Sequence, residues 1–162
     1  MVATRAEIID AIQAGRNRVT ATFSKLSEDQ LQSKIHEGSD GWNARQILAH
    51  LANRQPTYDM LVSIAVDGNG TPPGGFSIDD WNQKLVEERA GRTREELLEE
   101  FQQVHDHLIE RARKLRDDQL SFPVILPNRE TNLGNVLLGS GGMHSIQHAS
   151  EVEEALGIDP DE

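Results

Sequence analysis

The sequence contains no cysteine among its 162 residues. This absence excludes a disulfide framework, a thiolate metal site and a nucleophilic cysteine, so any metal ion would have to be held by nitrogen and oxygen ligands. It also agrees with a reducing compartment. The first ten residues include Arg5, Glu7 and Asp10 and lack the continuous apolar stretch of a signal peptide. We therefore expect a cytoplasmic protein.

Long apolar runs are lacking as well. The best run, Met60 to Val66, is interrupted by Ser63 and is followed by Asp67 and Gly68. A transmembrane helix needs roughly eighteen or more apolar residues in succession. With a mean hydropathy of −0.55, the chain is expected to be soluble and to have no membrane partner.

Basic residues are few, since 16 lysines and arginines stand against 27 aspartates and glutamates and leave a net charge of −11. So acidic a chain repels phosphate backbones unless its cations are clustered. The one cluster consists of Arg111, Arg113, Lys114 and Arg116. Asp117 and Asp118 follow it directly, which favours a solvated helix end over a nucleic-acid patch. We expect no nucleic-acid partner.

Four amphipathic helices are indicated by capping residues and by apolar side chains at helical spacing. The residues expected to cap the N-termini of these helices are Thr4, Asn43, Thr93 and Thr131. The second helix should run to Gly68, and Pro56 should kink it or lie near a bend. The fourth should end at Gly157, and the glycines within it, at positions 134, 139, 141 and 142, should weaken it.

Shorter elements lie between these helices. A capping box at Ser27 predicts a short helical turn, and the glycine- and proline-rich stretch 67–76 predicts a surface loop. Ser77 should open a short extra helix that ends near Gly91, and residues 122–127 could be extended between their prolines. The length suits one domain, residues 1–162. The fold class expected is all-α, a four-helix bundle.

Two histidines of the last helix, His144 and His148, are four residues apart and should project from the same face. Such a pair also arises by chance, so alone it is weak evidence for a metal site. His50 lies on the apolar stripe of the second helix, and His144 and His148 lie on the stripe that Val152 extends, so all three side chains should point into the bundle. Three imidazoles that converge on a cation satisfy one another's lone pairs. The alternative is buried histidines hydrogen-bonded to the backbone or to Glu151.

The other three histidines are not expected to join this group. His105 and His107 are two residues apart, which places them on nearly opposite sides of the third helix. His36 lies in the loop before the second helix. We expect a surface role for all three.

Three segments carry a resemblance to a known family. They are residues 41–52 (GWNARQILAHLA), Asp80-Trp81-Asn82 and residues 142–148 (GMHSIQH). Together they resemble the DinB-like superfamily, which includes the YfiT-like proteins and the N-terminal domain of mycothiol-dependent maleylpyruvate isomerase. The resemblance covers nearly the whole chain. It implies an up-down-down-up four-helix bundle, a homodimer, and a divalent metal, often zinc or nickel, on His50, His144 and His148.

Three histidine ligands would leave at least one coordination position open, as in catalytic zinc sites. A metal there lowers the pKa of a bound water or thiol. The resemblance adds a low-molecular-weight thiol as a cosubstrate, because several family members are thiol-dependent transferases or isomerases. Candidate catalytic or ligand-orienting residues are Glu151, Asn53 and Asn82, with Arg54 as a further candidate. The alternative for each is a solvated helix face.

We therefore expect a metal-dependent enzyme, either a thiol-dependent S-transferase or a hydrolase, acting on an unidentified small molecule. A non-catalytic bundle that binds a metal or a small ligand as a stress or resistance protein is the alternative. A purely structural dimerisation domain is a third hypothesis. Trp42 is expected in the core at the end of the bundle rather than as a platform for substrate.

Overall fold

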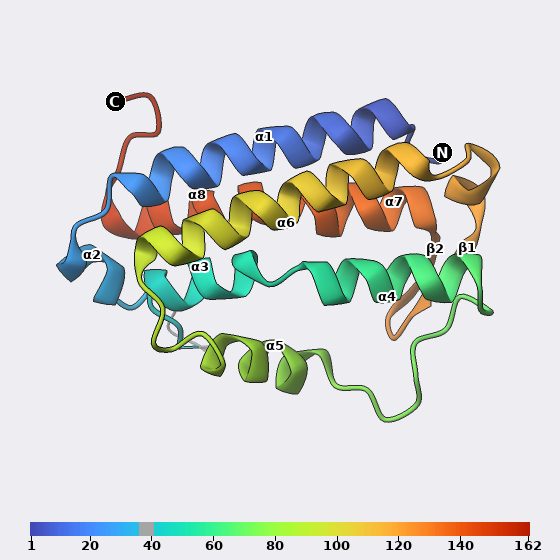
Figure 1. Ribbon diagram of the computed structural model, residues 1–162, viewed down its shortest axis with the longest axis horizontal. Coiled ribbons are helices and arrows are strands. Elements are labelled where there is room, and N and C mark those ends of the chain that lie inside the picture. Colours follow the sequence, from blue (N-terminus) through green and yellow to red (C-terminus); the bar gives the residue numbers. More distant parts are fainter. Residues whose placement is uncertain (36–40) are drawn as a thin grey trace.

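The computed structural model describes residues 1–35 and 41–162, so His36 lies outside the described residues. Four rods of helix lie side by side, and two of them are broken (Figure 1). The unbroken rods are α1 (Arg5–Ser24) and α6 (Arg94–Lys114). The broken ones are α3 (Ala44–Ala52) with α4 (Gln55–Val66), and α7 (Leu133–Leu137) with η2 (Leu138–Met143) and α8 (His144–Leu156). The first and last rods run one way and the other two run the opposite way, which is the expected up-down-down-up bundle (Figure 1).

The smaller elements decorate this bundle. They are α2 (Glu28–Gln32), α5 (Ile78–Glu87), the single turn η1 (Asp118–Ser121), and the strands β1 (Pro123–Leu126) and β2 (Arg129–Asn132). The two strands pair as an antiparallel hairpin in which Val124 lies opposite Thr131. Helix α5 is the short extra helix predicted after the glycine-proline loop, and it lies outside the bundle beside α3 (Figure 1).

Capping side chains begin most of the helices where the sequence predicts. Thr4, Asn43 and Thr93 each form a complete capping box with the residue three positions later. The predicted cap at Thr131 is wrong, because that residue is held in β2. Asn132 caps α7 instead, and its side-chain oxygen accepts a hydrogen bond of 2.9 Å from the backbone N–H of Asn135.

The second rod is broken rather than kinked. Helix α3 ends at Ala52, and the backbone of Asn53 leaves the helical region at φ −114° and ψ 45°. Pro56 then stands in the first turn of α4, where its missing N–H costs no helical hydrogen bond. The break therefore comes before the proline, and it leaves Asn53 and Arg54 between two helices in the bundle interior, where both are buried.

Three glycines of the fourth rod, at positions 139, 141 and 142, lie in η2, a π-helical segment whose wider turn is often found near functional sites. A Cβ at Gly142 would overlap the backbone and side chain of Ala11 in α1. One at Gly141 would come within 3.1 Å of the Tyr58 ring. These glycines therefore allow the close packing that leads the chain into α8.

The apolar core consists of two clusters. Members of the first include Ile12, Tyr58, Leu108 and Leu137. Members of the second include Phe23, Leu48, Phe101 and Val152. Among the buried polar residues outside these clusters are His50, Arg54, His105 and Ser145. They form a polar layer near the α3–α4 break.

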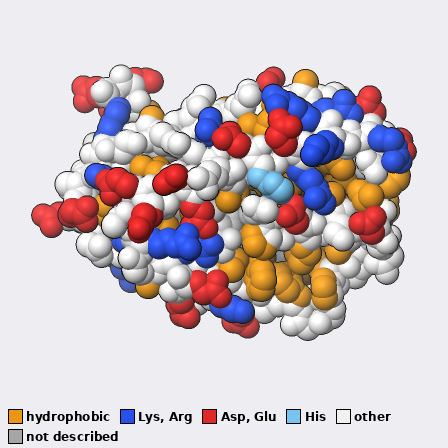
Figure 2. Space-filling view, in the orientation of Figure 1, with side chains coloured by type: hydrophobic (Ala, Val, Ile, Leu, Met, Phe, Trp, Pro, Cys, Tyr) orange, Lys and Arg blue, Asp and Glu red, His pale blue; other side chains and the backbone are white. Residues whose placement is uncertain are grey.

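On the face seen in Figure 2, acidic and basic side chains are interspersed, and hydrophobic side chains gather near α4. Within the described residues, none of the helices combines the length and the apolar character that crossing a membrane requires.

Candidate metal centre

His50 from α3 meets His144 and His148 from α8 inside the bundle. The Nε2 atoms of His50 and His144 are 2.8 Å apart. The centroids of the three rings are separated by 4.5, 5.0 and 5.3 Å. One ring nitrogen from each residue can be chosen so that all three lie within 4.8 Å of one another. The structure thus brings together the three histidines that the sequence analysis grouped.

The imidazoles of His50 and His144 are held in the neutral form. Only 5% of His50 is exposed. Burial, followed by the positive charge of Arg54, lowers the pKa of His50 well below its ordinary value of 6.5. Burial and then Arg54 also lower the pKa of His144 strongly. Neutral imidazoles keep the lone pairs that metal ligation requires.

Glu151 orients one of the three rings. Its Oε2 atom lies 2.8 Å from Nδ1 of His148, one turn earlier on α8. Its other oxygen accepts a hydrogen bond of 3.0 Å from Gln147. A carboxylate at one nitrogen of a histidine fixes the ring and makes the second nitrogen a better ligand. Glu151 therefore lies where a residue that positions a metal ligand should be.

Trp42 forms a wall of the site. Its ring centroid is 5.1 Å from that of His50, and the residue is buried in the second apolar cluster, as expected. Its indole N–H donates a hydrogen bond of 3.1 Å to Gln83 on α5. Asn82, the neighbour of Gln83, is half-buried, and its side chain makes no hydrogen bond within the described part of the chain. The structure thus places Asn82 on the helix that covers Trp42, without a polar link to the histidines.

Asn53 is engaged in a network at the end of α3. With its amide oxygen turned toward the guanidinium of Arg89, it accepts hydrogen bonds of 3.2 and 2.7 Å. Arg89 also binds Glu100 of α6 through a contact of 2.6 Å. Asn53 therefore helps to join the end of α3 to the segment that follows α5 and, through Arg89, to α6. Arg54, beside it, is only 7% exposed, so the alternative of a solvated helix face is wrong for both residues.

His105 is not at the surface, and that expectation was wrong. The residue is fully buried, with Nδ1 2.8 Å from the carbonyl oxygen of Phe101 and Nε2 3.2 Å from Oγ of Ser145. Burial lowers its pKa to about 4. Its position four residues after Phe101 and three before Leu108 places it on the apolar stripe of α6. This spacing predicts burial, whereas the spacing between His105 and His107 shows only that the two cannot bind one ion together. His107 is half-exposed and faces Asp59 at 3.4 Å.

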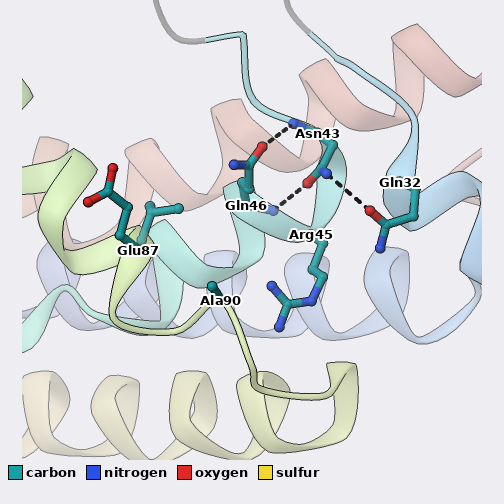
Figure 3. Close-up of a pocket in the computed structure, with 7 residues that line it drawn as sticks. Gln32, Asn43, Arg45, Gln46, Glu87 and Ala90 are labelled. Atoms are coloured by element: carbon teal, nitrogen blue, oxygen red, sulfur yellow. Dashed lines mark hydrogen bonds between the residues drawn. The ribbon is translucent and has the colours of Figure 1, made fainter.

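A separate cavity of about 280 Å³ lies where α3 begins. It is lined by Gln32, Asn43, Arg45, Gln46, Val86, Glu87 and Ala90 (Figure 3). None of the three histidines lines it. Asn43 and Gln46 hold each other in the capping box, and the Asn43 amide also donates to Gln32 at 3.4 Å (Figure 3). These side chains secure the start of α3 and take no part in the histidine group.

Comparison with known proteins agrees with this architecture. Residues 11–152, which include all three histidines, match the sequence profile of the DinB superfamily. The fold is similar to the solved structure of YfiT from Bacillus subtilis, with a TM-score of 0.73, 18% sequence identity, and coverage of 96% of this chain and 89% of that one. YfiT is described as a probable metal-dependent hydrolase with an unusual four-helix bundle topology. No curated protein matches the sequence significantly.

Proposed function

The chain belongs to the DinB superfamily, and from this premise we propose that it is a metal-dependent hydrolase whose divalent ion is held by His50, His144 and His148. The observation that carries the proposal is the convergence of three imidazoles from two helices. The description of YfiT as a probable metal-dependent hydrolase supports it.

The residues present fit such an ion. Imidazole nitrogen is a ligand that suits zinc and nickel, and a chain without cysteine offers no thiolate. Zinc binds histidine nitrogen at about 2.0–2.1 Å, and nitrogens that all lie within 4.8 Å of one another can reach one ion by small side-chain rotations. Burial keeps His50 and His144 neutral, so no proton competes for their lone pairs near pH 7.

The side chains around the histidines have defined tasks in this proposal. Glu151 holds the His148 ring in place, and Trp42 excludes water from one side of His50. With three protein ligands, a bound ion would keep a position for water and lower the pKa of that water toward neutrality. The same arrangement would serve S-transfer if an external thiol took the place of the water.

Elemental analysis of the protein purified without a histidine tag tests the metal. We expect about one equivalent of zinc or nickel, lost in the variants His144→Ala and His148→Ala. His107→Ala is the matched control, because His107 is half-exposed and pairs with Asp59. Equal loss of metal from the control would overturn the assignment.

The reaction can be tested on the metal-loaded protein. We expect hydrolysis of some member of a panel of small esters and amides, abolished in His50→Ala. After cobalt substitution, an absorption change on adding glutathione, bacillithiol or mycothiol, without hydrolysis of the panel, would favour the thiol-dependent S-transferase. The absence of both effects would favour the passive binding protein. The homodimer stays a prediction, which light scattering in solution would check.

A further inference from the structure

One arginine in the bundle interior has no acidic partner among the described residues. Arg54 is 7% exposed, and within the described residues its side chain makes a single hydrogen bond, a long one of 3.4 Å from Nη2 to the carbonyl oxygen of Ser140. Its Nε atom is buried without a partner. The other strongly buried charge, Glu153, is paired with Arg18 at 2.5 Å. Burying an unpaired charge costs several kcal/mol, so a guanidinium kept in this state calls for a function.

Arg54 lies just beyond the break that follows the helix of His50. It follows His50 by four residues, while Ser140 precedes His144 by four residues. The contact between His50 and His144 and the contact between Arg54 and Ser140 are therefore successive links between the same two rods. The charge of Arg54 also lowers the pKa of His50, His144 and His105. The guanidinium thus lies in the polar layer that contains the metal centre.

The start of α4 adds further donors at this place. This helix of 12 residues begins just after Arg54, with no side-chain cap and no acidic residue in its first turn. The hydroxyl of Thr57 in the same turn is buried and has no hydrogen-bond partner within the described residues. The amino end of a helix carries partial positive charge and favours anions. Two unpartnered buried polar groups therefore accompany a positive helix terminus.

We propose that Arg54, with Thr57 and the first turn of α4, binds a carboxylate of the substrate while the bond to be cleaved lies at the metal. This inference rests on the proposed hydrolase function and names the substrate class for it. A guanidinium presents two parallel N–H groups that match the two oxygens of a carboxylate. A single arginine also balances a single negative charge.

Thermal unfolding with small anions tests the subsite. Acetate and propionate, at tens of millimolar and at constant ionic strength, should raise the Tm of the metal-free and the zinc-loaded protein by about 3–6 °C, as expected for concentrations near ten times Kd. The neutral analogue acetamide should have no effect. A shift by acetamide as large as that by acetate would overturn the proposal, and a larger shift by inorganic phosphate would overturn the choice of a carboxylate.

Variants of the arginine make the test specific. Arg54→Gln should abolish the carboxylate shift and, because it removes an unpaired buried charge, should unfold at the same or a higher temperature than the unmodified protein without ligand. Arg54→Lys keeps the charge but lacks the two parallel N–H groups of a guanidinium, so it should bind acetate about tenfold more weakly. Arg113→Gln, at an exposed position near the end of α6, is the control and should keep the full shift.

The outcomes separate this proposal from the proposed function. A carboxylate shift that requires zinc and persists in Arg54→Gln means that the carboxylate binds the metal, which overturns the subsite and leaves the metal centre standing. A shift in metal-free protein that Arg54→Gln abolishes supports the subsite even if the protein retains no metal.

Discussion

His105 is a fully buried imidazole held at both ring nitrogens, and its pKa near 4 makes it sensitive to acid. Between pH 6.5 and 4 the unfolded chain binds a proton there and the folded chain does not, so stability falls as the pH falls through this range. The loss should approach about 3 kcal/mol at pH 4, at about 1.4 kcal/mol per pH unit. Urea unfolding at a series of pH values measures the free energy of unfolding. The metal-free unmodified protein should show this loss of stability, and metal-free His105→Gln should lack it. Parallel pH profiles would contradict the assignment.

Glu151 gives a second test at the scale of single residues. Replacing it with glutamine removes the charge that holds Nδ1 of His148 but keeps the volume. We expect zinc affinity to fall about 10-fold or somewhat more, in line with other residues that orient metal ligands, and any turnover to fall with it. Competition against a coloured chelator measures the affinity. Glu154→Gln, at an exposed position on the same helix, should leave affinity unchanged, and an unchanged affinity in Glu151→Gln would remove the orienting role.

At the scale of elements, local signals in the sequence predict where helices begin. The capping boxes at Thr4, Asn43 and Thr93 form as expected, because each depends on residues only three positions apart. A kink at Pro56 or a bend near it is predicted by the sequence, but the complete break after Ala52 is not. It depends on contacts between distant segments, such as the hydrogen bonds from Arg89 to Asn53.

The same distinction applies to the candidate site. Helical spacing and apolar neighbours identify His50, His144 and His148 as a group that points inward. The burial of Arg54 follows from the break in the second rod, which the sequence pattern presents as a kinked helix. Its role as an anion-binding residue could therefore be argued only from the assembled structure.

The glycines of η2 can be tested as a matched pair. A methyl group at Gly142 would collide with Ala11 and push α1 away from η2, so Gly142→Ala should destabilise the protein by about 1–3 kcal/mol. A Cβ at Gly139 meets nothing within 4 Å, so Gly139→Ala should be neutral or stabilising by up to about 1 kcal/mol. Urea unfolding measures both changes. Equal effects of the two substitutions would show that backbone propensity, and not close packing, determines where glycine is needed.

At the scale of the whole molecule, the polar layer lies between two apolar clusters and contains the metal centre. An ion bound there would tie the second rod to the fourth through His50 and the α8 histidines. A ligand that binds only the folded chain stabilises it by about 2.7 kcal/mol at one hundred times Kd. For a chain of this length that corresponds to a rise in Tm of about 5–11 °C.

Calorimetry with zinc and with a chelator checks this expectation. Zinc should raise the Tm of the metal-free protein, and the chelator should reverse the rise. His144→Ala should lose the response, because only two of the three ligands remain and they come from different rods. His107→Ala should keep it, since His107 faces Asp59 on the outside of the bundle. If zinc stabilised His144→Ala as strongly as the unmodified protein, the ion would be bound elsewhere, and the link between the metal and the packing of the two rods would be lost.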